Sequence, residues 1–327
     1  MVTILIVLSL IYGYLNGFHD SSNIVATIIS SHAMSPRMAL ALVAVAESAG
    51  PFIFGVAVAN SIGEGIVAPG SINTSVVLAT LISAIVWNLA TWFFGIPSSS
   101  SHALVGGLVG AVMADTGFQT VQLAGLTKVL VALFISPLLG LIAGYLVTKL
   151  TYFLARGSTP RINSFFRNAQ ILTGVTLALS HGANDAQKTM GIMTLGLVVT
   201  GVLPQFVVPT WVIALSAAAI ALGTASGGWR LIRTLGARFY KIRPVNGFCS
   251  QIASTAVILG AALLGGPVST TQVVSSAILG AGSAERVNKV RWGVAGQIVI
   301  AWVLTIPATA LLSVLVFTLI HQLLGSV

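Results

Sequence analysis

Two acidic residues, Asp20 and Asp185, each lie in a long apolar stretch beside other polar side chains. An apolar run precedes Asp20 and another follows it at residues 24–29, so a spanning helix would place this carboxylate near mid-membrane. An ionised carboxylate is costly at that depth unless it is paired or hydrated. An interrupted helix with Asp and Asn oxygens would suit Na⁺, and a proton is the other candidate. We therefore expect each motif to interrupt a helix and to bind a coupling cation.

A second kind of motif places a proline before a run of hydroxyl side chains, at Pro97 and again at Pro267. Proline suits the opening of a helix, serine and threonine cap it, and the free amides with the helix dipole bind anions. Neither motif contains Arg or Lys, so helix dipoles and co-transported cations would balance the anion. The residues that we expect to bind a tetrahedral oxyanion are Ser99, Ser100, Ser101, Ser269, Thr270 and Thr271.

The two kinds of motif occur twice, in the same order. GFHDSSN at 17–23 aligns with GANDAQK at 182–188, and GIPSSSSHALVGGLVGA at 95–111 aligns with GGPVSTTQVVSSAILGA at 265–281. Transporters are often built from such repeats. We predict an N-terminal repeat at 1–150 with a hairpin near 96–113, and a C-terminal repeat at 167–327 with a hairpin near 266–283. A linker at 151–166 joins them.

Composition excludes a soluble fold. The 327 residues are 56% hydrophobic and 6% charged, with a mean hydropathy of +1.00, whereas soluble domains carry about 25% charged residues. Each crossing takes about 20 apolar residues as a helix, so this length supplies about ten crossings. We predict an all-α polytopic membrane protein with about 10–12 transmembrane or half-spanning helices. They would form two inverted-topology repeats with broken helices and re-entrant hairpins.

The formal net charge is +9, and the basic residues lie between apolar segments. This placement indicates that they determine the orientation of the helices in the membrane rather than form a nucleic-acid-binding surface. Residues 59–73 contain no basic residue, whereas the equivalent stretch 229–243 contains five. Equivalent loops should therefore face opposite sides of the membrane. We predict a multi-pass plasma membrane protein with both termini extracytoplasmic and the linker at 149–167 cytoplasmic.

Several further polar residues have no role that their spacing decides. His19 and His181 adjoin the aspartate motifs, and a lone histidine in a bundle is usually a packing donor. Lys188 could balance Asp185, and Glu47 could cap a kink or take a proton. His102 and Gln272 end the hydroxyl runs at equivalent positions and could contact the substrate or each other.

At these residues the chain resembles the inorganic phosphate transporter (PiT) family over essentially its whole length. GANDAQKTMGI at 182–192 and NGFHDSSNIVAT at 16–27 are similar to that family's two signatures. The resemblance implies that phosphate binds to the hydroxyl side chains already named. It also implies that the coupling cation binds to Asp20, Asn23, Asn184 and Asp185.

The first signature departs from the GAND that the family often has, since His19 replaces an amide oxygen. Bacterial relatives similar in this respect are thought to use protons and to move neutral metal–phosphate complexes. The resemblance therefore leaves Na⁺ and H⁺ open as coupling ions. We expect no cofactor and no resident metal beyond Na⁺ at the aspartates, and a homodimer stays open.

These observations predict a secondary active transporter that imports phosphate by symport with Na⁺ or H⁺ through alternating access. A sulfate permease of the same fold and a passive anion channel are the alternatives. A membrane enzyme is disfavoured because the chain contains no HExxH, GxSxG or P-loop motif.

Overall fold

The computed structural model describes residues 1–228 and 243–324, and α-helices account for most of these ranges. This confirms the predicted all-α class. The helices are α1 (Val2–Ser30), α2 (Pro36–Phe54), α3 (Ala57–Gly63), α4 (Thr74–Phe94), α5 (Ser100–Asp115), α6 (Leu123–Leu154), α7 (Ile162–Val199), α8 (Thr210–Ser226), α10 (Pro244–Leu263), α11 (Thr270–Glu285) and α12 (Trp292–Leu324).

Six of these helices are long and apolar enough to cross a membrane: α1, α2, α4, α6, α10 and residues 298–323 of α12. Their outer faces carry large exposed apolar side chains, such as Leu138 and Ile142 on α6 and Leu311 and Leu315 on α12. A helix satisfies its own backbone hydrogen bonds, so it can present such a face to lipid. The protein is therefore an integral membrane protein.

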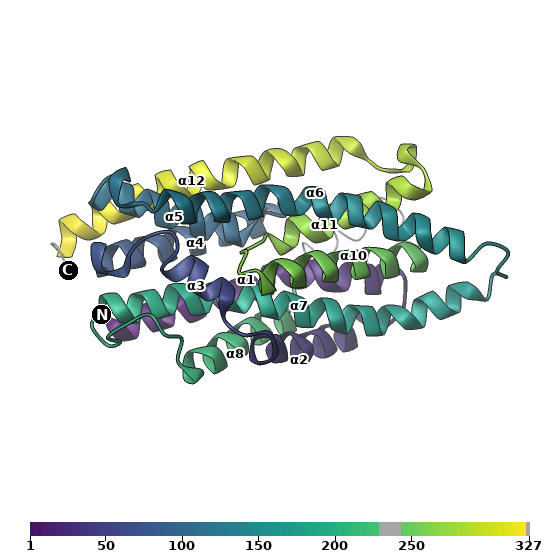
Figure 1. Ribbon diagram of the computed structural model, residues 1–327, viewed down its shortest axis with the longest axis horizontal. Coiled ribbons are helices and arrows are strands. Elements are labelled where there is room, and N and C mark those ends of the chain that lie inside the picture. Colours follow the sequence, from purple (N-terminus) through teal and green to yellow (C-terminus); the bar gives the residue numbers. More distant parts are fainter. Residues whose placement is uncertain (229–242, 325–327) are drawn as a thin grey trace.

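Two helical hairpins enter the molecule from opposite ends (Figure 1). The hairpin of α4 and α5 opens toward the end that holds both termini, and the hairpin of α10 and α11 opens toward the end that holds the α6–α7 loop. Their tips meet, because the Ser101 hydroxyl at the start of α5 donates a hydrogen bond of 3.0 Å to the Val268 carbonyl before α11. The starts of α5 and α11 therefore lie together inside the bundle.

The helices α1 and α7 continue without a break through the two aspartate motifs. The prediction that these motifs interrupt their helices is therefore wrong. The glycines of both motifs serve close helix packing. A Cβ on Gly17 would collide with the Ile220 carbonyl of α8, and a Cβ on Gly182 would collide with the Glu47 carbonyl of α2. The backbone of α1 and α7 keeps its hydrogen bonds, and the interruptions in the fold lie at the hairpin tips instead.

Small residues also set the distance between α6 and α11. Gly140 and Gly144 on α6 lie against the backbone of Val273 and Ala277 on α11, and Gly280 on α11 lies against the backbone of Leu141. Helices in membranes pack closely where small residues let their backbones approach. This contact holds the hairpin of α10 and α11, the second hairpin, in place.

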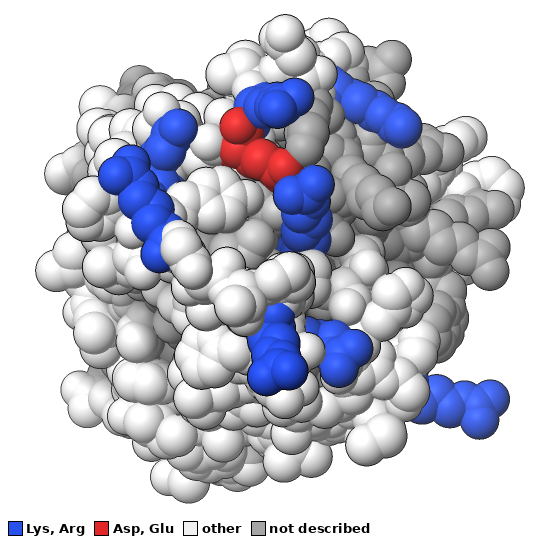
Figure 2. Space-filling view, turned by 90° about the vertical axis from the view of Figure 1, so that its right-hand side faces the viewer, with Lys and Arg blue, Asp and Glu red and all other residues white. Residues whose placement is uncertain are grey.

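The end of the molecule at the right of Figure 1 is rich in basic side chains, which surround a small acidic patch (Figure 2). It contains the α6–α7 loop, where Arg156 and Arg161 are exposed. The basic residues expected between 229 and 242 lie outside the described residues.

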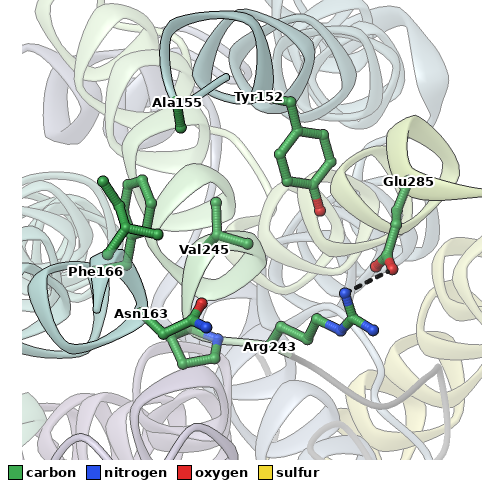
Figure 3. Close-up of a pocket in the computed structure, with 9 residues that line it drawn as sticks. Tyr152, Ala155, Asn163, Phe166, Arg243, Val245 and Glu285 are labelled. Carbon is green, nitrogen blue, oxygen red and sulfur yellow. Dashed lines mark ion pairs between the residues drawn. The ribbon is translucent and has the colours of Figure 1, made fainter. Parts of the chain in front are cut away.

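A pocket at this end lies among the ends of α6 and α11 and the starts of α7 and α10 (Figure 3). Tyr152 and Asn163 line it, and Arg243 forms an ion pair with Glu285 at 3.2 Å. This ion pair joins the two open ends of the second hairpin. No residue predicted to bind the anion or the cation lines this pocket.

We predict that Gly280→Ala destabilises the protein, because the added methyl group meets the backbone of Leu141. Overpacking of this kind costs about 1–3 kcal/mol. The matched control is Gly260→Ala on α10, where an added Cβ meets nothing within 4 Å and helix propensity improves by about 0.5–1 kcal/mol. Thermal denaturation of the two purified variants in detergent measures the difference. An equal loss of stability in both would contradict this packing argument.

Candidate functional site

The two aspartates, which are 165 residues apart in the sequence, lie in one buried cluster. The Thr270 hydroxyl lies 3.2 Å from Asp20 Oδ2 and 3.0 Å from Asp185 Oδ2. His181 Nε2 faces the same two oxygens at 3.7 and 3.4 Å without a hydrogen bond to either. Neither carboxylate is more than 1% exposed. The start of α11 therefore brings together side chains from α1 and α7.

Neutral donors surround Asp20. The Thr271 hydroxyl donates to Asp20 Oδ1 at 2.6 Å, and the Asn23 amide nitrogen lies 2.9 Å from the same oxygen. That amide nitrogen also lies 3.0 Å from the Thr271 hydroxyl oxygen. His19 Nδ1 lies 3.4 Å from Asp20 Oδ1. Residues of α1 and of the second hairpin thus share one network.

A charged donor stands beside Asp185. Lys188 Nζ donates to Asp185 Oδ1 at 2.6 Å and to the Val268 carbonyl at 2.9 Å, and both side chains are fully buried. The neighbouring Asn184 amide donates to the Gly266 carbonyl at 3.2 Å. The polar side chains of α7 therefore hold the loop that precedes α11.

Glu47 of α2 belongs to the same cluster, which the sequence did not reveal. His181 Nδ1 contacts Glu47 Oε1, and the Thr224 hydroxyl of α8 donates to Glu47 Oε2 at 2.5 Å. A lone acidic residue in an apolar run was the available signal. The partners were not visible because the packing of α2 against α7 and α8 is tertiary information.

The two hydroxyl-rich helix starts have equivalent caps. The Ser99 hydroxyl accepts the His102 amide at 3.2 Å at the start of α5, and the Ser269 hydroxyl accepts the Gln272 amide at 3.4 Å at the start of α11. The side chains of His102 and Gln272 lie 3.3 Å apart. Both helix starts are therefore capped as expected and are close neighbours.

Asn16 of the first aspartate motif and Tyr12, which no sequence motif singled out, also reach the start of α5. The Ser100 hydroxyl donates to the Asn16 side-chain oxygen at 2.6 Å, and the Tyr12 hydroxyl donates to the Ser100 carbonyl at 3.2 Å. The six hydroxyl residues predicted to bind the anion are all at least 98% buried. Helix α1 thus contacts both hairpins, through Asn16 and Tyr12 at α5 and through Asp20 at α11.

Several polar atoms in this cluster are buried without a hydrogen-bond partner. They are Asn16 Nδ2, His19 Nε2, Asn23 Oδ1, His102 Nε2, His181 Nε2 and Asn184 Oδ1. Buried polar groups are normally satisfied, so these atoms have the capacity to hydrogen-bond a polar ligand. One ligand atom from each of Asp20, His181 and Asp185 lies within 4.8 Å of the others, a spacing that could hold a metal cation.

The fold and the site together define a class of protein. Opposed helix starts that meet inside a membrane bundle, beside buried carboxylates, are typical of secondary transporters, which bind anions at helix N-termini near mid-membrane.

Comparison with known proteins gives the family. Residues 16–161 and 154–313 match the model of the phosphate transporter family. A protein of Rhizobium meliloti (strain 1021), described as a probable low-affinity inorganic phosphate transporter, is 45% identical over 96% of this chain and 94% of its own length. One of Bacillus subtilis (strain 168) with the same description is 40% identical over 99% of this chain and 98% of its own length. The chain belongs to the phosphate transporter family. The relatives that match it are described as transporters, not as enzymes.

A solved structure has the same fold. It is described as the sodium-dependent phosphate transporter, and it matches with a TM-score of 0.89 and 24% identity over 99% of both chains. The all-helical arrangement predicted from the sequence is therefore confirmed by a related structure.

We predict that Thr271→Val destabilises the cluster, because the isosteric side chain removes the hydroxyl between Asn23 and Asp20. Leaving such buried groups unsatisfied costs about 1–3 kcal/mol. Thr318→Val on α12 is the control, since the Thr318 hydroxyl is exposed and donates only to the Val314 carbonyl of its own helix. The midpoint temperature of thermal unfolding in detergent should fall for Thr271→Val and stay unchanged for Thr318→Val. Equal midpoints for both variants would argue against the network.

Proposed function

We propose that the protein is a secondary active transporter that imports inorganic phosphate by symport with Na⁺ or H⁺ through alternating access. The observation that carries the proposal is the meeting of two hydroxyl-rich helix starts with two carboxylates in one buried cluster. The names of the relatives support phosphate as the substrate. The mirrored sequence motifs support a repeat with inverted topology.

Phosphate would bind at the starts of α5 and α11. The free amides of a helix start and its dipole favour an anion, and serine and threonine hydroxyls add hydrogen bonds. The proposed ligands are Ser99, Ser100, Ser101, Ser269, Thr270 and Thr271, with His102 and Gln272 as accessory residues. Lys188 is the one fully buried lysine or arginine among the described residues, and it is already paired with Asp185. The charge of phosphate is therefore balanced largely by a cation that enters with it.

The coupling cation would bind at Asp20 and Asp185, with Asn23 and Asn184 supplying amide oxygens. Asn23 Oδ1 and Asn184 Oδ1 are both buried and unpartnered, which suits a cation that prefers oxygen ligands. The related solved structure is described as sodium-dependent, which supports Na⁺. The contacts of His181 and His19 with the carboxylates support H⁺.

We propose that the basic end of the molecule faces the cytoplasm of the cell, as the positive-inside rule favours. This end contains the α6–α7 loop and lies opposite both termini (Figure 1). The plasma membrane is the proposed location. The opposed hairpins would then open to opposite sides of the membrane, which suits alternating access.

Uptake of labelled phosphate into proteoliposomes tests the proposal. An inward Na⁺ or H⁺ gradient should accelerate uptake, and Asp20→Asn should reduce it about 100-fold through loss of about 3 kcal/mol of charged interactions. Glu64→Gln, which alters an exposed residue after α3, should leave uptake unchanged. Symport through Asp20 is wrong if uptake is equally fast in the Asp20 variant and without gradients.

Competition between anions tests the substrate. Phosphate near neutral pH still carries a proton and can donate a hydrogen bond to a carboxylate, whereas sulfate cannot. Unlabelled phosphate should therefore displace labelled phosphate at a concentration at least about tenfold lower than the concentration of sulfate that has the same effect. This ratio corresponds to a difference in binding free energy of about 1.4 kcal/mol. Equal competition by sulfate would instead support a sulfate permease of the same fold.

A further inference from the structure

The two mirrored carboxylates differ in how their charge is compensated. The aligned motifs place Asn23 and Lys188 at the same position, three residues after Asp20 and Asp185. Each side chain donates to the aspartate of its own helix, Asn23 at 2.9 Å and Lys188 at 2.6 Å. The asparagine is neutral and the lysine carries a full positive charge. Equivalent geometry therefore gives unequal electrostatics.

The lysine ammonium occupies a position suited to a small cation. Lys188 is among the largest fully buried side chains of the described residues. Its Nζ contacts a carboxylate oxygen of Asp185 and the backbone carbonyl of Val268 at 2.9 Å. These are the oxygen types that bind Na⁺ in transporters. The Val268 carbonyl also accepts the Ser101 hydroxyl, so the ammonium lies where the two hairpins touch.

Asp20 has no comparable partner among the described residues. Its close neighbours are the neutral donors Asn23, Thr270 and Thr271, and two imidazoles, His19 at 3.4 Å and His181 at 3.7 Å. The oxygen of the Asn23 amide is buried and makes no hydrogen bond. A carboxylate and a free amide oxygen at one place can receive a cation that comes from solution.

From this asymmetry we infer that Lys188 is a tethered cation that permanently neutralises Asp185, so that of the two mirrored aspartates only Asp20 recruits a mobile coupling cation. The inference rests on the proposed symport function and refines its stoichiometry. A buried carboxylate that loses its partner is strongly disfavoured. A chain without the ammonium must therefore bring one more cation into the cluster each time the site closes.

Counting cations per phosphate tests this role. Reconstituted carriers are held at zero voltage by valinomycin and equal K⁺, and the driving-ion gradient that just balances a fixed phosphate gradient is measured. Lys188→Asn, which copies the first motif, should add one cation per phosphate to the wild-type value. Lys188→Arg keeps the charge and should keep the wild-type ratio. A folding defect alone lowers the rate but does not move this balance point.

A second variant covers the case in which Lys188→Asn does not fold. Asp185→Asn combined with Lys188→Gln removes both charges together, so no unpaired charge is left in the cluster. The ratio of cations to phosphate should then equal that of the wild type. If Asp185 itself carried a mobile cation, the ratio would fall by one.

The outcomes separate this inference from the proposed function. A wild-type carrier whose phosphate flux ignores both Na⁺ and H⁺ gradients would end the symport proposal. Coupled transport with an unchanged ratio in folded Lys188→Asn, or a ratio one lower in the double variant, would overturn the role of Lys188 and leave symport intact. An increase of one cation in Lys188→Asn, with none in the double variant, supports it.

Discussion

The structure depends on one constraint: charged side chains that are buried inside a membrane protein, away from water, need partners that neutralise them. Three carboxylates, of Asp20, Glu47 and Asp185, are at most 1% exposed, and the Lys188 ammonium and His181 imidazole are fully buried beside them. Ionised groups are tolerated at such depth only when they are paired or hydrogen-bonded. Each carboxylate here contacts side chains from more than one helix, so the polar cluster fixes the positions of α1, α2, α7, α8 and the second hairpin together.

The hairpins solve a related problem of the backbone. A helix that starts inside a membrane protein exposes amides that have no partner within the helix. Ser99 and Ser269 each accept one of these amides. The start of α11 touches the start of α5 and contacts the carboxylates of Asp20 and Asp185 through Thr270. The helix starts proposed to bind the anion and the carboxylates proposed to bind the cation therefore lie in one cluster. In the proposed symport, simultaneous binding of both ions would lower the cost of each and so couple their transport.

Much of this arrangement follows from the sequence, because the repeated motifs place the same residue types at the same spacing. The mirrored Asp20 and Asp185 and the two hydroxyl runs predicted one site, and the apolar runs predicted the helices. The expectation that the aspartate motifs interrupt their helices is wrong, because Gly17 and Gly182 instead permit close helix packing. Only the neighbouring carbonyls of Ile220 and Glu47 reveal this role. The contacts of Glu47 depend on how α2 packs, which no local pattern contains.

The unequal motifs bear on the return of the empty carrier. Alternating access requires the site to close both with its ligands and without them, and each closed state must leave little uncompensated charge. Two mobile cations at Asp20 and Asp185 would both depart with phosphate and leave both carboxylates bare. With a tethered Lys188, which is paired with Asp185, Asp20 would be the only one of the two mirrored aspartates to lose its cation in the empty carrier, next to His19 and His181. In the proposed symporter, an ammonium at the position where the first motif has a neutral amide would thus ease the empty return step, while one mobile cation would remain to couple the loaded step.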